Sequence, residues 1–354
     1  MNCKHLKMRS FTLFALLITL AATACSKGDN TFEYNDPYAV ADFTIDGLTP
    51  DNFPYIDCST STSPLRDMVM FDLLGIKSYW GSDYIAGSTY HLYFDVPGHL
   101  VPNTEEYTRF VNRVYDLRAY SGSHGAYVNL MDGVTDLVID SRDLSRNELK
   151  EAQEKGVEIE TKPLAWDALV FIANPGNRVK SLSQEEIRDI YAGRISSWRE
   201  VGGAAHGIHP YMRNADSGSQ EKMETMVMKG TPMVDWPEMI GSAMLSPYFS
   251  IEQDTWGIGY TPYYYCERMV GNLRRVKVLA VDGVYPNAAT ILNGAAGRKR
   301  DAYPYVSNIY AAIRKDAPAD SYARKIYDWL STPRAKDLVD GSGYISMRSH
   351  KLPN

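Results

Sequence analysis

The chain has 354 residues, of which 44% are hydrophobic, 12% aromatic and 23% charged. This composition is ordinary for one large or two mid-sized globular domains, and it excludes a disordered or fibrous protein. The formal charge is −6 at pH 7, and it becomes −9 without the first 24 residues, which hold three basic residues and no acidic one. Because the chain is acidic, we do not expect it to bind nucleic acid.

The N-terminus has the pattern of an export signal. Three basic residues precede an apolar run over residues 11–22, which is too short to span a bilayer comfortably. The run ends in Ala22-Thr23-Ala24-Cys25, which resembles the lipobox at which bacterial lipoproteins are cleaved and acylated. We therefore expect a lipoprotein signal peptide over 1–24, lipidation of Cys25, and a polar tether over 25–42 that holds the protein on the bacterial cell envelope, at its periplasmic face or at the cell surface. The alternative is a cleaved secretory signal followed by an incidental Cys.

From residue 43 onward, short apolar runs alternate with capped helices, which is typical of an α/β protein. Three runs predict strands, at residues 134–139, 157–161 and 168–173. We expect Pro163 to separate the second strand from the third, since proline cannot donate to a sheet.

Helices are predicted where a capping residue precedes a helical pattern. The expected caps are Ser145 with Glu148, Ser183 with Glu186, and Asp320. Gly156 and Gly193 should end the first two helices.

Three further stretches place hydroxyl residues and glycines where a strand gives way to a helix. They are residues 58–65 (C-S-T-S-T-S-P-L), 122–127 (G-S-H-G-A-Y) and 213–220 (R-N-A-D-S-G-S-Q). A helix N-terminus carries unpaired N–H donors and about half a positive charge, so each stretch is a candidate anion-binding loop. We expect Ser63 to cap the first helix and Ser217 to form a capping box with Gln220, while Arg213 adds a planar fork suited to an oxyanion. From these residues alone, we predict an anion-binding cleft between two α/β lobes.

Other site chemistries find little support in the sequence. Asp216-Ser217-Gly218 matches one aspartic-protease loop, but that chemistry needs two. A hydrolase that uses Ser217 as nucleophile lacks a placed base, because His206 and His209 lie on the wrong side of the loop. No histidine pair has metal-ligand spacing, so we expect no metal site. Cys58 and Cys266 either pair or remain free thiols.

The order and spacing of motifs over residues 57–347 resemble the phosphate-binding proteins of bacterial ABC importers and their lipoprotein relatives. That family shows a helix ending in G-K-I-x-x-W, then V-G-G, then R-x-x-x-S-G-[ST]. This chain has G-R-I-S-S-W, V-G-G and R-N-A-D-S-G-S in the same order. The likeness extends to four further segments, at residues 57–61, 136–142, 257–260 and 281–284.

The resemblance implies an α/β, two-lobed periplasmic binding protein-like fold with two crossing strands between the lobes. Lobe I would comprise 43–165 plus 306–354, and lobe II would comprise 166–305. The implied protein is a monomer without cofactor or catalysis, which captures phosphate or a similar small oxyanion in the inter-lobe cleft for import through an ABC permease. The alternative is a surface or sensor lipoprotein that uses the same fold for another ligand.

The resemblance also assigns ligand-binding residues, position by position. They are Thr60 and Ser61 in the first loop, Ser123 or His124 in the second, Ser141 and Arg142 after the strand, and Arg213, Ser217, Gly218 and Ser219 on the opposite lobe. In the family, an Asp often follows the strand and accepts the proton of hydrogen phosphate, which rejects sulfate. Here that position falls on Ser141, with Asp140 beside it. Alternation along the strand places these two residues on opposite sides, so we expect Asp140 to face away and phosphate and sulfate to bind within about tenfold of each other. The alternative is that Asp140 faces the cleft and accepts the proton, in which case sulfate is strongly rejected and Asp140→Asn should admit it.

The span over residues 62–122 is longer than in the compact importers and is rich in aromatic residues, among them Tyr79, Trp80, Tyr84, Tyr90 and Tyr93. The simpler interpretation is an insertion that packs its own small core. The alternative is an aromatic wall that extends the binding site.

Overall fold

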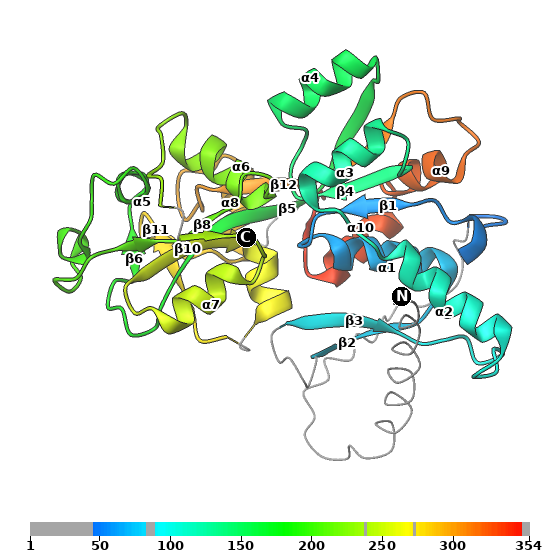
Figure 1. Cartoon of the computed structure of the whole chain (residues 1–354), viewed down its shortest axis with the longest axis horizontal. Coiled ribbons are helices and arrows are strands. Elements are labelled where there is room, and N and C mark those ends of the chain that lie inside the picture. Colours follow the sequence, from blue (N-terminus) through cyan, green and yellow to red (C-terminus); the bar gives the residue numbers. More distant parts are fainter. Residues whose placement is uncertain (1–44, 83–88, 237–238, 272–273, 349–354) are drawn as a thin grey trace, which may run out of the picture. The chain divides into compact units, whose positions relative to one another are not determined.

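The computed structural model describes residues 45–82, 89–236, 239–271 and 274–348, which belong to one compact unit (Figure 1). The expected signal peptide, Cys25 and the tether over 25–42 lie outside the described residues. Within the described part of the chain, no helix is both long and apolar enough to cross a membrane.

Nine strands of the described residues form one mixed sheet, in the order β1-β4-β12-β5-β10-β7, with β11 and β13 also paired to β5 and with β6 paired to β11. Its strands are β1 (Ile56–Cys58), β4 (Leu137–Asp140), β5 (Ile159–Ala173), β6 (Ser181–Leu182), β7 (His209–Pro210), β10 (Gly257–Pro262), β11 (Lys277–Val281), β12 (Val306–Arg314) and β13 (Ile345–Ser346). Two small sheets pair β2 (Ser78–Ser82) with β3 (Tyr90–Phe94), and β8 (Met212–Arg213) with β9 (Ile240–Gly241).

Helices connect and cover these strands. The α-helices are α1 (Ser63–Leu74), α2 (Glu105–Leu117), α3 (Gly122–Met131), α4 (Arg146–Lys155), α5 (Gln184–Tyr191), α6 (Gly218–Lys222), α7 (Ser246–Gln253), α8 (Ala288–Ala295), α9 (Tyr322–Trp329) and α10 (Pro333–Ser342). Shorter turns of other helix types are the 3-10 helices η1 (Pro50–Asn52) and η2 (Trp198–Val201) and the π-helices η3 (Met223–Met228) and η5 (Tyr265–Val270).

Two strands, β5 and β12, cross between the two lobes of the fold (Figure 1). The first ten residues of β5 pair antiparallel with the whole of β12, which in turn pairs with β4. The last five residues of β5 pair with β10, and the last three of these pair also with β11. The two-lobed α/β fold with two crossing strands is thus confirmed, whereas the lobe boundaries 43–165 plus 306–354 and 166–305 remain a prediction.

The expected break at Pro163 is wrong, because β5 runs through this residue without interruption. Pro163 lies opposite Tyr310, directly where the register of β12 shifts between Ile309 and Tyr310. Such an irregularity tolerates a residue that lacks an N–H, since the regular ladder is already interrupted there. The two strands expected at 157–161 and 168–173 are therefore parts of one strand.

Two of the expected helix caps are confirmed. Ser145 and Glu148 form a reciprocal capping box, and the helix ends at Gly156 with positive φ. Ser183 and Glu186 form a second box in the same way. Both pairs lie within one turn of helix, so the local sequence is enough to specify them.

Three other expected caps differ in the structure. Two lie at the neighbouring residue, and the third lacks the expected reciprocal hydrogen bond. Ser321 rather than Asp320 caps α9, accepting a hydrogen bond from the backbone N–H of Arg324 at 3.2 Å. The helix α1 begins one residue earlier than expected, so that Thr62 occupies the cap position in place of Ser63. Ser217 caps α6 without a reciprocal box, because the side-chain oxygen of Gln220 accepts from the hydroxyl of Tyr260 instead.

Within the span over residues 62–122, aromatic side chains of α1, β3 and α2 contact one another. The Phe94 ring lies 5.5 Å from that of Phe71 and 5.6 Å from that of Tyr115, and Leu92 is buried beside them. Phe71 and Leu92 are part of the main hydrophobic core, and Phe94 packs against it, so the described part of this span does not form a separate small core as expected. Tyr84 lies outside the described residues.

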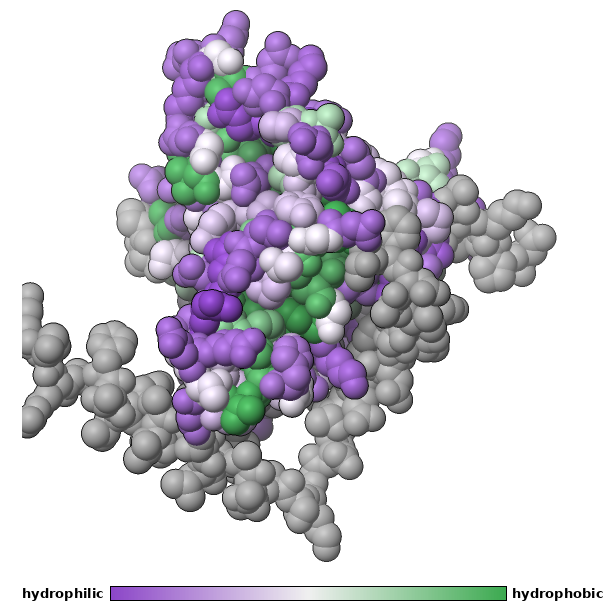
Figure 2. All heavy atoms as spheres, turned by 90° about the vertical axis from the view of Figure 1, so that its right-hand side faces the viewer, coloured by the Kyte–Doolittle hydropathy of each residue, from purple (hydrophilic) through white to green (hydrophobic). Residues whose placement is uncertain are grey.

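Most of the surface seen in Figure 2 is polar, with apolar side chains in limited areas. The two described cysteines are both buried and unpaired: Cys58 in β1 and Cys266 in η5. Burial raises the pKa of each thiol to about 12, so neither is a reactive thiolate near neutral pH.

Candidate functional site

The first loop and the end of β4 lie side by side, because β1 and β4 are parallel neighbours whose carboxyl ends meet at one edge of the sheet. The Thr62 hydroxyl donates to the carbonyl of Ile139 at 2.7 Å. The Tyr344 hydroxyl donates to the carbonyl of Ser61, also at 2.7 Å. Ser61 is fully buried and Thr60 is half-buried in this turn, so the structure fixes both predicted residues beside the end of β4.

The start of α6 comes against the second loop and the residues after β4. A Cβ atom added to Gly218 would lie 2.5 Å from the Ser123 hydroxyl oxygen and 3.0 Å from that of Ser141. Only glycine allows this approach. Three predicted site residues from three separate segments, Ser123, Ser141 and Gly218, are therefore brought together, and Ser217 and Ser219 flank the contact.

Asp140 does not face away, in contrast to the expectation from strand alternation. Its carboxylate is fully buried, and both Ser123 and the ammonium group of Lys222 are close enough to lower its pKa. Neither carboxylate oxygen has a partner with hydrogen-bond geometry among the described residues. The alternation rule fails here because β4 ends at Asp140, so Ser141 already belongs to the following loop and can turn to the same side.

Burial dominates the ionisation of Asp140. Desolvation raises the pKa of this carboxyl to about 6, even though the charge of Arg142, the Ser123 hydroxyl and the charge of Lys222 all favour the ionised form. The group is thus an acceptor at neutral pH and becomes a donor in mildly acidic solution.

Lys222, which the sequence analysis missed, lies at the other end of α6. It is buried, and its Nζ has no hydrogen-bond partner among the described residues. Burial lowers its pKa, and the carboxylates of Asp167 and Asp140 oppose this effect. The sequence spacing could have indicated this residue. Lys222 follows the predicted site residue Ser219 by three positions, which places both on one face of a helix.

Arg142 and His124 share one carboxylate. Both Nη atoms of Arg142 donate to Glu148 at 2.7 Å, and His124 Nδ1 lies 3.0 Å from Oε1 of the same carboxylate. Burial would raise the pKa of Glu148, but the hydrogen bonds and charge of Arg142 outweigh it and lower that pKa. Both Nη groups of Arg142 are therefore already bonded to Glu148. Its buried Nε is the one guanidinium nitrogen without a hydrogen-bond partner among the described residues.

Arg213 is buried without an ion pair in the described part of the chain. Its Nε donates to the carbonyl of Gly241 at 3.1 Å, and Nη1 lies 3.1 Å from the sulfur of Met244. Burial lowers the pKa of this guanidinium. The structure shows no direct bond from Arg213 to the Ser123–Ser141–Gly218 contact among the described residues, so its role as a ligand remains a prediction.

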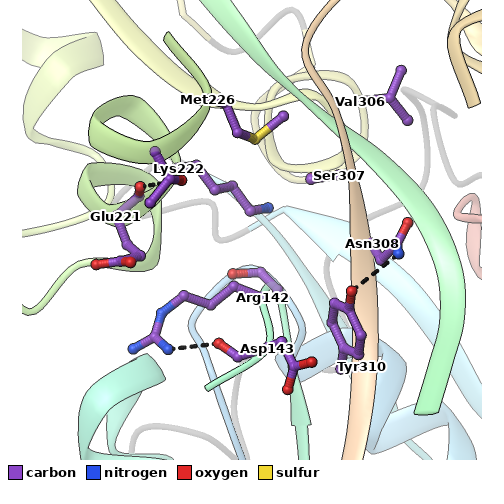
Figure 3. Close-up of a pocket in the computed structure, with 11 residues that line it drawn as sticks. Arg142, Asp143, Glu221, Lys222, Met226, Val306, Ser307, Asn308 and Tyr310 are labelled. Atoms are coloured by element: carbon purple, nitrogen blue, oxygen red, sulfur yellow. Dashed lines mark hydrogen bonds between the residues drawn. The ribbon is translucent and has the colours of Figure 1, made fainter. Parts of the chain in front are cut away.

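A cavity of about 330 Å³ adjoins this contact (Figure 3). Ser141 and Arg142 line it from the end of β4, and Lys222 extends into it from α6 towards the crossing strand β12. Asn308 and Tyr310 of β12 lie on its other side, joined by a hydrogen bond of 3.1 Å.

Several polar atoms in this region are buried without a hydrogen-bond partner in the described structure: Asp140 Oδ1 and Oδ2, Arg142 Nε, Ser219 Oγ and Lys222 Nζ. Such atoms are rare in folded proteins because each costs free energy. The set combines donors with one carboxylate acceptor, which suits a ligand that both accepts and donates hydrogen bonds. In the described residues, no three His, Cys, Asp or Glu side chains are grouped to hold a metal ion.

The histidines considered for a hydrolase are engaged elsewhere. His209 Nδ1 lies 2.6 Å from the carboxylate of Asp254, and the ring of His206 stacks on Trp256 with centroids 3.9 Å apart. The Ser217 hydroxyl accepts a hydrogen bond from the backbone N–H of Ser219 as a helix cap. This geometry does not build a nucleophile–base pair at Ser217.

Comparisons with a family model and with known proteins agree on one family. A family model described as the PBP superfamily domain matches residues 105–332. The phosphate-binding protein PstS of Borreliella burgdorferi is 22% identical over 242 residues, which cover 64% of this chain and 78% of that protein. The phosphate-binding protein PstS of Staphylococcus epidermidis is 25% identical over 193 residues, 53% of this chain and 58% of that protein. This chain thus aligns with little more than half the length of the second relative.

The solved structure of an ABC-type phosphate transport receptor from Vibrio cholerae has a similar fold. The TM-score is 0.53 at 20% sequence identity, over 84% of this chain and 99% of that one. At this level of identity, the similarity establishes the fold alone.

Proposed function

We propose, since the chain belongs to the PBP superfamily, that it captures phosphate or a similar small oxyanion where α3, the end of β4 and α6 meet. The supporting observation is the set of buried, unpartnered polar atoms of Asp140 and Ser219 at that point. Relatives named as phosphate-binding proteins and a similar fold described as a phosphate transport receptor support the same ligand class.

Hydrogen phosphate fits this set better than sulfate does. Its unprotonated oxygens accept hydrogen bonds from donors such as the Ser219 hydroxyl, and its hydroxyl donates to the Asp140 carboxylate. Sulfate has no proton near neutral pH, so it would place an acceptor oxygen against that carboxylate, a repulsive mismatch. We therefore propose strong selection for phosphate, in place of the near-equal binding expected from the sequence.

The protein works by lobe closure and performs no catalysis in this proposal. The approach of Gly218 to Ser123 and Ser141 joins the two predicted lobes directly at the binding point. Closing there removes the ligand from water, which strengthens every hydrogen bond to its charge. Thr60, Ser61, His124, Arg213 and the flanking residues of α6 complete the proposed site.

We propose further that the protein is a monomer, held on the cell envelope through acylated Cys25, that hands its ligand to an ABC permease. The lipobox-like segment supports the anchor, and the names of the relatives support the transport role over a sensor or surface role. Co-purification of a permease with the anchored protein would test this part.

Isothermal titration calorimetry of the mature chain with phosphate and with sulfate tests the ligand. We expect phosphate to bind at least about a hundredfold more tightly than sulfate at pH 8, because one buried acceptor mismatch is worth about 3 kcal/mol. Equal affinities, or no phosphate binding at all, would overturn the proposal.

The variant Arg213→Ala tests the opposite side of the site. Losing a charged contact from a closed, desolvated site should weaken phosphate binding about a thousandfold. Arg213→Lys should also bind poorly, since an ammonium group cannot present two parallel donors. Unchanged phosphate affinity in the Ala variant would remove Arg213 from the site.

A further inference from the structure

Lys222 is a buried charge that the motif pattern of the family does not include. The R-x-x-x-S-G-[ST] motif ends at Ser219, and Lys222 lies three residues further along α6. Only 3% of the residue is exposed. Long cationic side chains normally extend to water, so a fully enclosed ammonium group needs a compensating partner.

Two buried carboxylates on different elements act on this ammonium group through their charge. Asp167 lies on the crossing strand β5 and Asp140 at the end of β4, and both favour the charged form of Lys222. Asp167 Oδ1 accepts from the backbone N–H of Tyr264 at 3.0 Å, while its Oδ2 has no hydrogen-bond partner in the described structure. The two carboxylates therefore hold the ammonium group by charge at longer range, not by direct hydrogen bonds.

The direction of the side chain is consistent with a ligand contact. Lys222 extends from α6 towards β12, into the cavity next to Arg142 (Figure 3). Its neighbour on the same helix face, Ser219, also carries a buried and unpartnered oxygen. An oxyanion held between them would accept from both, and hydrogen phosphate would also donate to Asp140.

We infer that Lys222 is a further ligand-binding residue, which donates to an oxygen of the bound phosphate, and that Asp167 positions its ammonium group from the crossing strand. This inference rests on the proposed function. It adds one positive charge to the site, which favours oxyanions with two negative charges, such as hydrogen phosphate, over anions with one.

The test is calorimetry of the mature chain with inorganic phosphate at pH 8. Lys222→Met keeps the length and apolar character of the side chain while removing its charge. We expect this variant to bind phosphate about ten to a hundred times more weakly, the range for a lost hydrogen bond to a charged group. The same change at Lys229, an exposed residue just after η3, should leave the affinity unchanged and serves as the matched control.

A second variant separates ligand binding from a structural role. Lys222→Met leaves Asp167 buried without its counter-charge, which by itself should lower the melting temperature. The double variant Lys222→Met/Asp167→Asn removes both charges. We expect it to regain the melting temperature of the wild type but not the phosphate affinity.

Three outcomes would contradict the inference. If the wild type binds phosphate and Lys222→Met binds it equally well, Lys222 is not a ligand and the proposed function stands. If the double variant regains the affinity together with the melting temperature, the lysine acts only in folding. If the wild type does not bind phosphate, the proposed function and this inference both fail.

Discussion

Replacing Asp140 by Asn should stabilise the unliganded protein at pH 8 and admit sulfate to the site. The change is nearly isosteric and removes a fully buried negative charge. Both effects follow from the same cause, since the folded protein holds an ionised carboxylate there without direct hydrogen-bond partners among the described residues. In the proposed site, this unpaired acceptor is also the group that rejects sulfate.

The size of the effect follows from the pKa of this group. Burial raises the pKa of Asp140 from 3.8 to about 6, and this difference corresponds to about 3 kcal/mol. Because the folded protein holds the proton more tightly than the unfolded chain, the group favours folding in full below about pH 4. That contribution is lost as the pH rises through about 6. Asn carries no charge and escapes the loss, so we expect a gain of up to about 3 kcal/mol at pH 8.

This gain already includes the effects of the neighbouring charges on the pKa of Asp140. Arg142 and Lys222 favour the ionised carboxylate, whereas Glu148 opposes it. Arg142 keeps its two hydrogen bonds to Glu148, and Lys222 keeps the nearby charge of Asp167. We therefore expect a net gain on the order of 3 kcal/mol at pH 8.

Urea unfolding followed by circular dichroism, in phosphate-free buffer, measures the free energy of unfolding of both proteins at pH 8 and pH 4. Most of the difference should vanish at pH 4, where the carboxyl of the folded wild type is protonated. Asp235→Asn, at an exposed position, should show no difference at either pH. The reasoning would be refuted if Asp140→Asn were less stable than the wild type at pH 8, or if it were more stable by the same amount at both pH values.

Three further changes follow from other contacts. Gly218→Ala should weaken phosphate binding about tenfold in calorimetry, because the added Cβ would lie 2.5 Å from the Ser123 hydroxyl oxygen and push α6 away; unchanged affinity would show that this approach is not needed. Glu148→Gln should lower the free energy of unfolding by about 3 kcal/mol, because it leaves the buried Arg142 guanidinium without its carboxylate; a loss under 1 kcal/mol would mean that the pair is screened. Cys25→Ser should move the protein from the membrane fraction to the soluble fraction after a high-salt wash; retention in the membranes would contradict lipid anchoring.

How much of the fold could be predicted depends on how local the interactions are. The capping boxes at Ser145 and Ser183 lie within one turn of helix, and the structure has both. The break expected at Pro163 fails because the partner strand β12 shifts its register at that point, and β12 is more than a hundred residues further along the chain. A distant strand thus overrides the local signal of the proline.

The family and the two-lobed fold could be predicted from the sequence, because the order and spacing of the motifs carry the resemblance. The same resemblance assigns Ser123, Ser141 and Gly218 to one site, and the structure has them together. The expectation that a strand precedes residues 122–127 is wrong, since α3 follows the helix α2.

The buried charges beside the Ser123–Ser141–Gly218 contact could not be predicted in this way. Asp140, Asp167 and Lys222 lie on three separate elements. In the sequence, Asp167 and Lys222 resemble ordinary surface residues, and Asp140 is expected to face away from the cleft. Glu148, expected only as a helix cap, also occupies the fork of Arg142. Whether a charge is buried, and what balances it, depends on the packing of segments that no local pattern connects, because desolvation is a property of the whole surroundings and not of neighbouring residues.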